Sequence, residues 1–244
     1  ITLQTQAPKF LDAEFEKHRV LSSNSSSDRA IPLKKMVEKE IFIPSDIRLN
    51  ERGMQGSKQM PTYEKSEFQA DLRNLHDYTK NVLLKWENVH KQHLNRYLLG
   101  FSLQDKIVTG TEWENFFKLR LNPEADPAFY ELSRVMKEAI DASTPKELSD
   151  GEFHLPYIWE EEHDKWDLSE LIKFSVARCA RVSYYNHDKS APTPENDLRL
   201  FDMLYEQEHM SPFEHQAKPY TPTVGSDYWP EGVTHKDVHG NHWS

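Results

Sequence analysis

The chain has 244 residues, a formal net charge of −10, 37% hydrophobic residues and one cysteine, Cys179. An acidic balance argues against general nucleic-acid binding, and no apolar run approaches the roughly 20 residues of a membrane span. A single cysteine excludes an internal disulfide and a cysteine-rich zinc site, and no secretory pattern is visible, so we expect a cytoplasmic protein. The sequence starts at Ile1 without Met and stops abruptly at Ser244, so we expect residues to be missing at both ends.

The first notable segment lies between Arg19 and Arg29 and consists mostly of serine and asparagine. A guanidinium matches phosphate oxygens two at a time, and small polar side chains let backbone amides approach an anion. A flexible linker is the usual alternative for this composition. Apolar residues close on both sides, such as Phe15 and Ile31, argue against a linker. The segment is therefore a candidate phosphate-binding site.

Strands are possible over 17–21 and 40–43, and a long amphipathic helix is predicted from about 65 to 97. Its apolar stripe consists of Leu72, Leu75, Val82, Trp86, Val89 and Leu94. The β-branched run 105–109, bounded by Gly110, predicts a strand. Thr111, with Glu114 three residues later, predicts a capped helix that runs through Arg120.

Asp126 and Pro127 predict the start of another helix, because proline suits the first helical turn. Its predicted inward residues are Phe129, Leu132, Val135, Met136 and Ile140. Two further helices are predicted over 168–178 and 196–208, with a strand over 182–184. The stretches 44–63, 144–165 and 216–241 have loop composition. The pattern predicts a helix-rich α+β fold, with a mixed or antiparallel sheet and long helices.

Four separated segments carry a family resemblance. Lys17-His18-Arg19, followed by seven residues and then Ser27, is similar to an Arg-His-Arg, seven residues, Ser signature. The other segments are Arg96-Tyr-Leu-Leu, Asn115-Phe-Phe-Lys-Leu-Arg120, and the pair Ala180-Arg181-Val-Ser183-Tyr with His209-Met-Ser211-Pro-Phe-Glu214-His. Together they resemble the flavin-dependent thymidylate synthases, the ThyX family. The motif order is circularly permuted relative to the common form, so we expect a long variant with one catalytic domain over 1–244 and motif blocks at 10–33, 93–121 and 175–217.

The resemblance implies FAD as the cofactor, with these residues around it: Lys17, His18, Arg19, Asn24, Asn115, Arg181, Ser183, His209, Ser211 and Glu214. Two positions depart from the family pattern. Lys17 replaces an arginine, which keeps the charge and loses the bidentate fork, and Ser25 stands where many relatives have glutamate.

The resemblance also implies dUMP as the substrate, held by Ser27, Arg29, Arg96 and Arg120. Arg120, His209 and Ser27 are the expected catalytic residues; a guanidinium facing the pyrimidine carbonyl would stabilise charge as C5 becomes nucleophilic. Methylenetetrahydrofolate and NADPH are the expected co-substrates, and the expected assembly is a homotetramer with shared active sites. Neither nucleic acid nor membrane is an expected partner.

Cys179 has apolar neighbours and is expected to be a buried, inert thiol, which suits a flavin enzyme that needs no cysteine nucleophile. Two alternatives stay open: a related flavin- and folate-dependent pyrimidine nucleotide methylase or hydroxymethylase, and a non-catalytic nucleotide- or FAD-binding homologue. A metal site is not expected, although His235, His239 and His242 are spaced by four and three residues in a loop-like segment.

Overall fold

The computed structural model describes residues 1–53, 56–184, 193–219, 235–236 and 242–243, with 183–184, 235–236 and 242–243 described by their backbone. The strands are β1 (Thr2–Pro8), β2 (Ser22–Ser25), β3 (Leu103–Thr109), β4 (His235–Lys236) and β5 (His242–Trp243). The α-helices are α1 (Asp12–Phe15), α2 (Leu33–Met36), α3 (Thr62–Leu84), α4 (Lys91–Leu94), α5 (Glu114–Arg120), α6 (Pro127–Ala142), α7 (Glu160–His163), α8 (Leu168–Tyr184) and α9 (Pro194–Glu206). Three 3-10 helices are η1 (Lys9–Leu11), η2 (Asn95–Leu98) and η3 (Ser211–Glu214).

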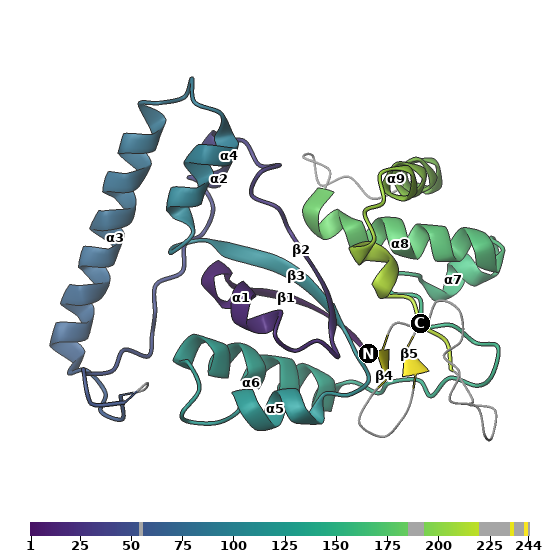
Figure 1. Ribbon diagram of the computed structural model, residues 1–244, viewed down its shortest axis with the longest axis horizontal. Coiled ribbons are helices and arrows are strands. Elements are labelled where there is room, and N and C mark those ends of the chain that lie inside the picture. The colour runs from purple at the N-terminus through teal and green to yellow at the C-terminus, as the bar shows by residue number, and fades with distance from the viewer. Residues whose placement is uncertain (54–55, 185–192, 220–234, 237–241, 244) are drawn as a thin grey trace.

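A three-stranded antiparallel sheet occupies the centre of the molecule, with α5 and α6 below it, α8 and α9 to its right and α3 at the left edge (Figure 1). β3 is the middle strand and pairs with β1 from Thr2↔Thr109 to Pro8↔Leu103. On its other side β2 pairs from Ser22↔Thr109 to Ser25↔Lys106. The helix-rich α+β prediction and the strand predicted at 105–109 are confirmed.

Two hydrophobic cores lie on opposite faces of β3, because successive side chains of a strand point to opposite faces of the sheet. Val108 is fully buried against the aromatic cluster of α1, α5 and α6. Ile107, its neighbour, is fully buried on the other face and packs with Cys179 and Val182 of α8. The two adjacent apolar residues of β3 are therefore explained by burial on both faces.

Aromatic rings dominate the core beneath the sheet. Phe116 contacts Phe15, Phe129 and Trp113, with ring centroids between 5.5 and 6.1 Å apart. Edge-to-face contacts of this kind stabilise the fold beyond their area. The start of α6 is local in origin: the Asp126 carboxylate accepts from the amides of Ala128 and Phe129, as the Asp-Pro pair predicts.

An ionic network joins the helices on the opposite face. Asp197 of α9 is fully buried, and its carboxylate accepts from Arg178 at 2.9 Å and from Arg181 at 2.6 Å. Arg178 also pairs with Glu162 of α7 at 2.6 Å. Since isolated buried charges are costly, the paired groups hold α7, α8 and α9 in one arrangement.

The helix predicted over 65–97 is divided in two. α3 ends at Leu84, and the chain reverses before α4, so that Leu94 and Leu98 pack with Leu83 against Leu33 and Met36. Within the predicted apolar stripe, Leu75 and Trp86 are exposed. Periodicity could not indicate this reversal, because the apolar spacing continues through the turn. None of the described helices is long and apolar enough to cross a membrane.

Five local predictions are wrong. Residues 182–184 belong to α8, because Val182 packs against the sheet from a helix. α5 starts at Glu114 with Trp113 as its N-cap and no side-chain cap, so Thr111 caps nothing. The stretch 17–21 contains turns, and 40–43 contributes one bridge, Ile41↔Ser102. Val135, predicted to face inward on α6, is 42% exposed.

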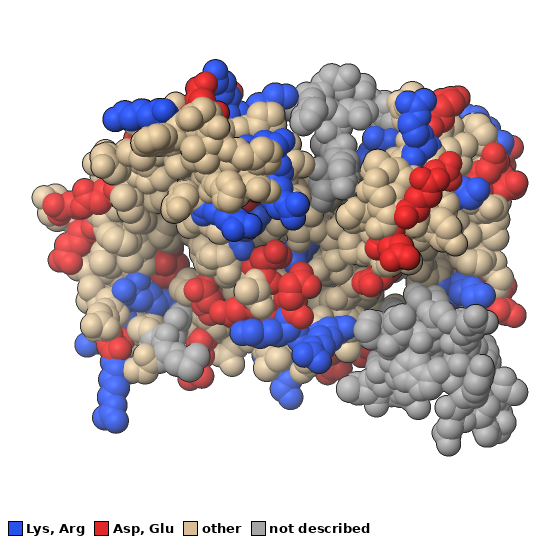
Figure 2. All heavy atoms as spheres, turned by 45° about the horizontal axis from the view of Figure 1, so that its top comes forward, with Lys and Arg blue, Asp and Glu red and all other residues tan. Residues whose placement is uncertain are grey.

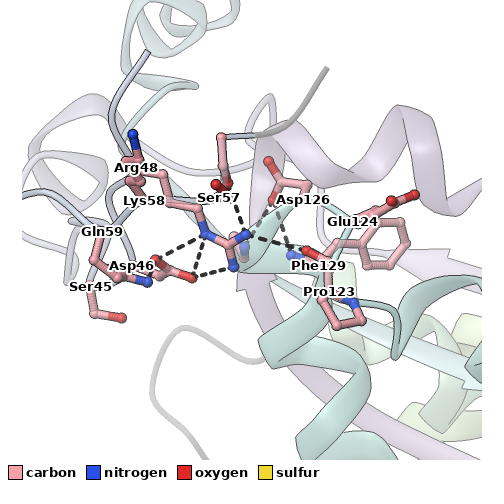
Figure 3. Close-up of polar contacts among 12 residues, drawn as sticks. Ser45, Asp46, Arg48, Ser57, Lys58, Gln59, Pro123, Glu124, Asp126 and Phe129 are labelled. Atoms are coloured by element: carbon pink, nitrogen blue, oxygen red, sulfur yellow. Dashed lines mark hydrogen bonds and ion pairs between the residues drawn. The ribbon is translucent and has the colours of Figure 1, made fainter. Parts of the chain in front are cut away.

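Arg48 fastens the long segment before α3 to the turn between α5 and α6 (Figure 3). Its guanidinium donates to Asp46 at 2.9 Å and to the carbonyls of Gly56 and Pro123 at 3.1 and 3.3 Å. The pKa of the Asp46 carboxyl is lowered, chiefly by this hydrogen bond from Arg48.

The end of the 209–217 motif lies beside the start of β1. Thr109 Oγ1 contacts both Thr2 Oγ1 at 2.7 Å and His215 Nδ1 at 2.8 Å. His154 bridges the same two segments, since its ring contacts Thr2 at 2.7 Å and its amide donates to the Ala217 carbonyl at 2.7 Å. Segments that are distant in sequence thus lie side by side.

Candidate active site

β2 and the turn after it position the serine-rich segment. Pairing with β3 continues beyond the strand, where the Ser26 amide donates to the Asp105 carbonyl at 2.8 Å. The Gln104 side chain then donates to the Ser26 carbonyl at 2.9 Å. The segment is therefore held to the sheet and is not a flexible linker.

The turn that follows is anchored through Asp28, which is buried. Its carboxylate pairs with Lys9 at 2.5 Å, and its carbonyl accepts from Asn95 Nδ2 at 2.8 Å. With Asp28 held inside, the residues on either side of it, Ser27 and Arg29, are exposed. A fixed turn thus presents a hydroxyl and a guanidinium to the surface.

Ser27 and Arg29 line a cavity of about 420 Å³. This volume lies within the range of small-molecule sites. The lining residues come from β2 and its turn, from α4, and from α8 to η3: Asn24, Ser27, Arg29, Ala30, His90, Gln92, Ala180, Leu204, His209, Ser211 and Pro212. None of these described residues is acidic, although the chain as a whole has a net charge of −10. The cavity therefore favours an anionic ligand.

Asn24 links the two motif segments across this cavity. Its Nδ2 donates to the Cys179 carbonyl of α8 at 3.0 Å. Its Oδ1 accepts from Ser211 Oγ at 3.1 Å, across 187 residues of sequence. Both ends of the amide are engaged by protein, so Asn24 orients Ser211 relative to the serine-rich segment.

Arg120 and His18 form a second cluster, among the aromatic rings beneath the sheet. Arg120 Nε donates to His18 Nε2 at 2.9 Å, Nη1 pairs with Glu14 at 3.0 Å, and the guanidinium lies 4.3 Å from the Phe129 ring centroid. His18 must be neutral to accept this bond. Burial lowers the pKa of His18, which also favours the neutral ring, and the positive charge of Arg120 lowers it further.

The structure brings only part of the predicted set together. Asn24, Ser27, Arg29, His209 and Ser211 share the cavity. The other predicted residues do not line it in this chain: Lys17, His18, Arg19, Arg96, Asn115, Arg120, Arg181 and Glu214. Of these, Lys17, Arg19, Arg96, Asn115 and Glu214 are exposed, whereas Arg181 is paired with Asp197. Their assigned contacts stay predictions.

Four residues singled out in the sequence lie partly or wholly outside what the structure describes. Ser183 lies in α8, but its side chain is outside the described part of the chain. The same holds for the side chains of His235 and His242, and for His239 altogether.

Cys179 is fully buried, and burial raises the pKa of its thiol to about 12. Its sulfur accepts from Gln216 Nε2 at 3.6 Å. A thiol of this kind is not ionised near neutral pH, which agrees with the expected inert cysteine.

Sequence reasoning missed His90 and Gln92. Both flank the start of α4, a helix of four residues, and no motif or periodicity marks them. Their presence in the cavity depends on the chain reversal after α3. On the face shown in the space-filling view, Lys and Arg side chains gather near the middle, with acidic side chains directly below them (Figure 2).

A comparison with curated proteins found no match. The chain does match the sequence model of one family, Thy1, described as thymidylate synthase complementing protein, over residues 1–146. The matched part contains the serine-rich segment, His90, Arg96 and Arg120, whereas the 177–215 motifs lie beyond it. Since more than half of the chain is matched, the protein belongs to the thymidylate synthase complementing protein family.

Proposed function

We propose that this protein is a flavin-dependent thymidylate synthase. It would convert dUMP and methylenetetrahydrofolate to dTMP and tetrahydrofolate, with NADPH as the electron source and FAD as the cofactor. One observation carries the proposal: a single cavity without carboxylates joins the segment expected to hold the nucleotide, Ser27 and Arg29, to the segment expected to hold the flavin, His209 and Ser211. A cytoplasmic location fits the single, buried thiol.

Arg29 is the main phosphate ligand in this proposal. It forms no ion pair with any described residue, so its guanidinium is free for a bidentate contact with phosphate. Ser27 adds a hydroxyl beside it. The buried apolar side chains of Ala180, Leu204 and Pro212 form the floor of this cavity.

Arg120 does not line the cavity of its own chain, so in this proposal it acts on a pyrimidine held by another copy of the chain. Glu14 and His18 hold two edges of its guanidinium, and the Phe129 face supports it. A cation positioned in advance stabilises developing negative charge without reorganisation during the reaction. Neutral His18 orients Arg120 by accepting from its Nε, and the Glu14 carboxylate offsets part of its positive charge.

The residues that surround the cavity fit part of a flavin cofactor. His209 and Ser211 supply an imidazole and a hydroxyl, which can hydrogen-bond to ring or phosphate oxygens. FAD would supply hydride transfer when bound. Since Lys17, Arg19, Asn115 and Glu214 are exposed away from the cavity lining, we propose that copies of the chain complete one another's sites in a homotetramer.

The first test is an absorbance spectrum of the purified protein supplied with FAD, followed by anaerobic NADPH titration with and without dUMP. Flavin bands that bleach with NADPH, and dTMP among the products, are expected. Arg29→Ala should weaken dUMP binding, whereas Arg73→Ala on the exposed side of α3 is the matched control. A hydroxymethylated product would favour the related hydroxymethylase, and FAD or dUMP binding without turnover would favour the non-catalytic homologue. A protein that binds neither would refute the proposal.

A further inference from the structure

We infer that His90 is an additional ligand for the nucleotide phosphate, in the cavity that it lines together with Arg29. This inference rests on the proposed function and deepens it. The resemblance assigns a phosphate contact to Arg96, but the residues of this segment that line the cavity with Ser27 and Arg29 are His90 and Gln92.

The ring of His90 is oriented by the backbone of its own segment. Its Nδ1 accepts a hydrogen bond from the Gln92 amide at 3.3 Å, because His90 is the N-cap of α4. An Nδ1 that accepts must be unprotonated, so the proton of the neutral ring is on Nε2. The imidazole thus keeps one N–H donor, and no described residue accepts from it.

The residues that follow His90 and Arg29 in the sequence, Lys91 and Ala30, hold the two segments together. Lys91 Nζ donates to the Ala30 carbonyl at 2.8 Å, which ties the start of α4 to the turn after β2. The same turn is held by Asn95, whose Nδ2 donates to the Asp28 carbonyl at 2.8 Å. His90 and Arg29 are therefore held at the same cavity by neighbouring contacts, before any ligand arrives.

The charges around the cavity favour a phosphate at this place. Arg29 is cationic, and the described lining residues include no carboxylate that could compete for it. A phosphate has several acceptor oxygens, so one group can accept from the fork of Arg29 and from Nε2 of His90 together. The uncharged nucleoside lacks this group and gains nothing from His90.

The test compares the binding of dUMP and of deoxyuridine by calorimetry, on protein saturated with FAD. His90→Ala should weaken dUMP binding by about tenfold, as for a hydrogen bond to a charged group, and leave deoxyuridine binding unchanged. His90→Ser keeps an N-cap acceptor but is too short to reach the ligand, so it should behave like the alanine variant. His93→Ala, exposed on the same helix and outside the cavity lining, is the matched control.

Two results would overturn the inference. Equal affinity of wild type and His90→Ser for dUMP would show that His90 does not touch the phosphate. An equal loss for dUMP and deoxyuridine would show that the substitution only disturbs the cavity. If wild type itself binds no dUMP, the proposed function fails and this inference fails with it, and the two failures are distinguished by the wild-type measurement alone.

Discussion

Acid should destabilise this fold through His215. The residue is fully buried, its Nδ1 contacts Thr109 Oγ1 at 2.8 Å, and no described residue bonds its Nε2. Burial lowers the pKa of His215 from 6.5 to about 4, and the nearby His154 adds to the effect. Between these two pKa values, the His215 ring is neutral in the folded state and protonated in the unfolded chain.

The sign and size follow from proton linkage. Stability rises with pH wherever the unfolded state binds more protons, so this contribution is complete above the unfolded pKa and is lost as pH falls toward the folded value. Integrating from about pH 7 to about pH 5 gives a loss of about 2 kcal/mol for His215 alone. His154, whose pKa is also lowered to about 4, chiefly by burial, acts in the same direction.

The assay is urea unfolding at several pH values between about 7 and 5, where most carboxylates stay ionised. His215→Asn should flatten the dependence of the unfolding free energy on pH by about 2 kcal/mol over this range, whereas the exposed control His93→Asn should leave it as in wild type. Equal pH dependence in His215→Asn and wild type would refute the reasoning.

Other outcomes follow from the cores on either side of the sheet. Asp197→Ala leaves Arg178 and Arg181 without their shared partner, so denaturant titration should show a loss of about 3–5 kcal/mol; a loss below about 1 kcal/mol would mean that the network is dispensable. Phe116→Ala should cost about 3–5 kcal/mol by opening a cavity among the rings, and unchanged unfolding would contradict the packing described. Cys179 should resist a thiol reagent until the protein unfolds, and fast labelling of the native protein would contradict its burial.

Local signals in the sequence predicted those elements whose causes are local. The start of α6 depends on Asp126 and Pro127, which act on the amides next to them, and the structure shows that cap. β3 was predicted from its β-branched residues before Gly110, and two of them, Ile107 and Val108, are fully buried on opposite faces. The serine-rich segment was predicted as a phosphate site from its residue types, its apolar flanks and the family resemblance, and Asn24, Ser27 and Arg29 line the cavity.

Errors occurred where a distant partner decides the outcome. β1 was not predicted, because its polar alternating sequence becomes a strand by pairing with β3, about a hundred residues away in sequence. Residues 182–184 have strand-like composition, yet they continue α8. In this helix Val182 packs against Ile107 of the sheet. α3 ends at Leu84 because the chain turns back to pack Leu94 and Leu98 beside Leu83. The spacing of apolar residues in the sequence does not reveal this turn.

The sequence by itself determined the family, the α+β class and the chemical types of the site residues, because these depend on residue identity and spacing along the chain. Only the tertiary structure decided which of those residues meet. It brought Ser27 and Arg29 to His209 and Ser211, placed His18 beneath the sheet on Arg120, and added His90 to the cavity. The reason is physical: the direction of a side chain depends on strand register and on the element packed against it, and both arise from contacts between segments far apart in the chain.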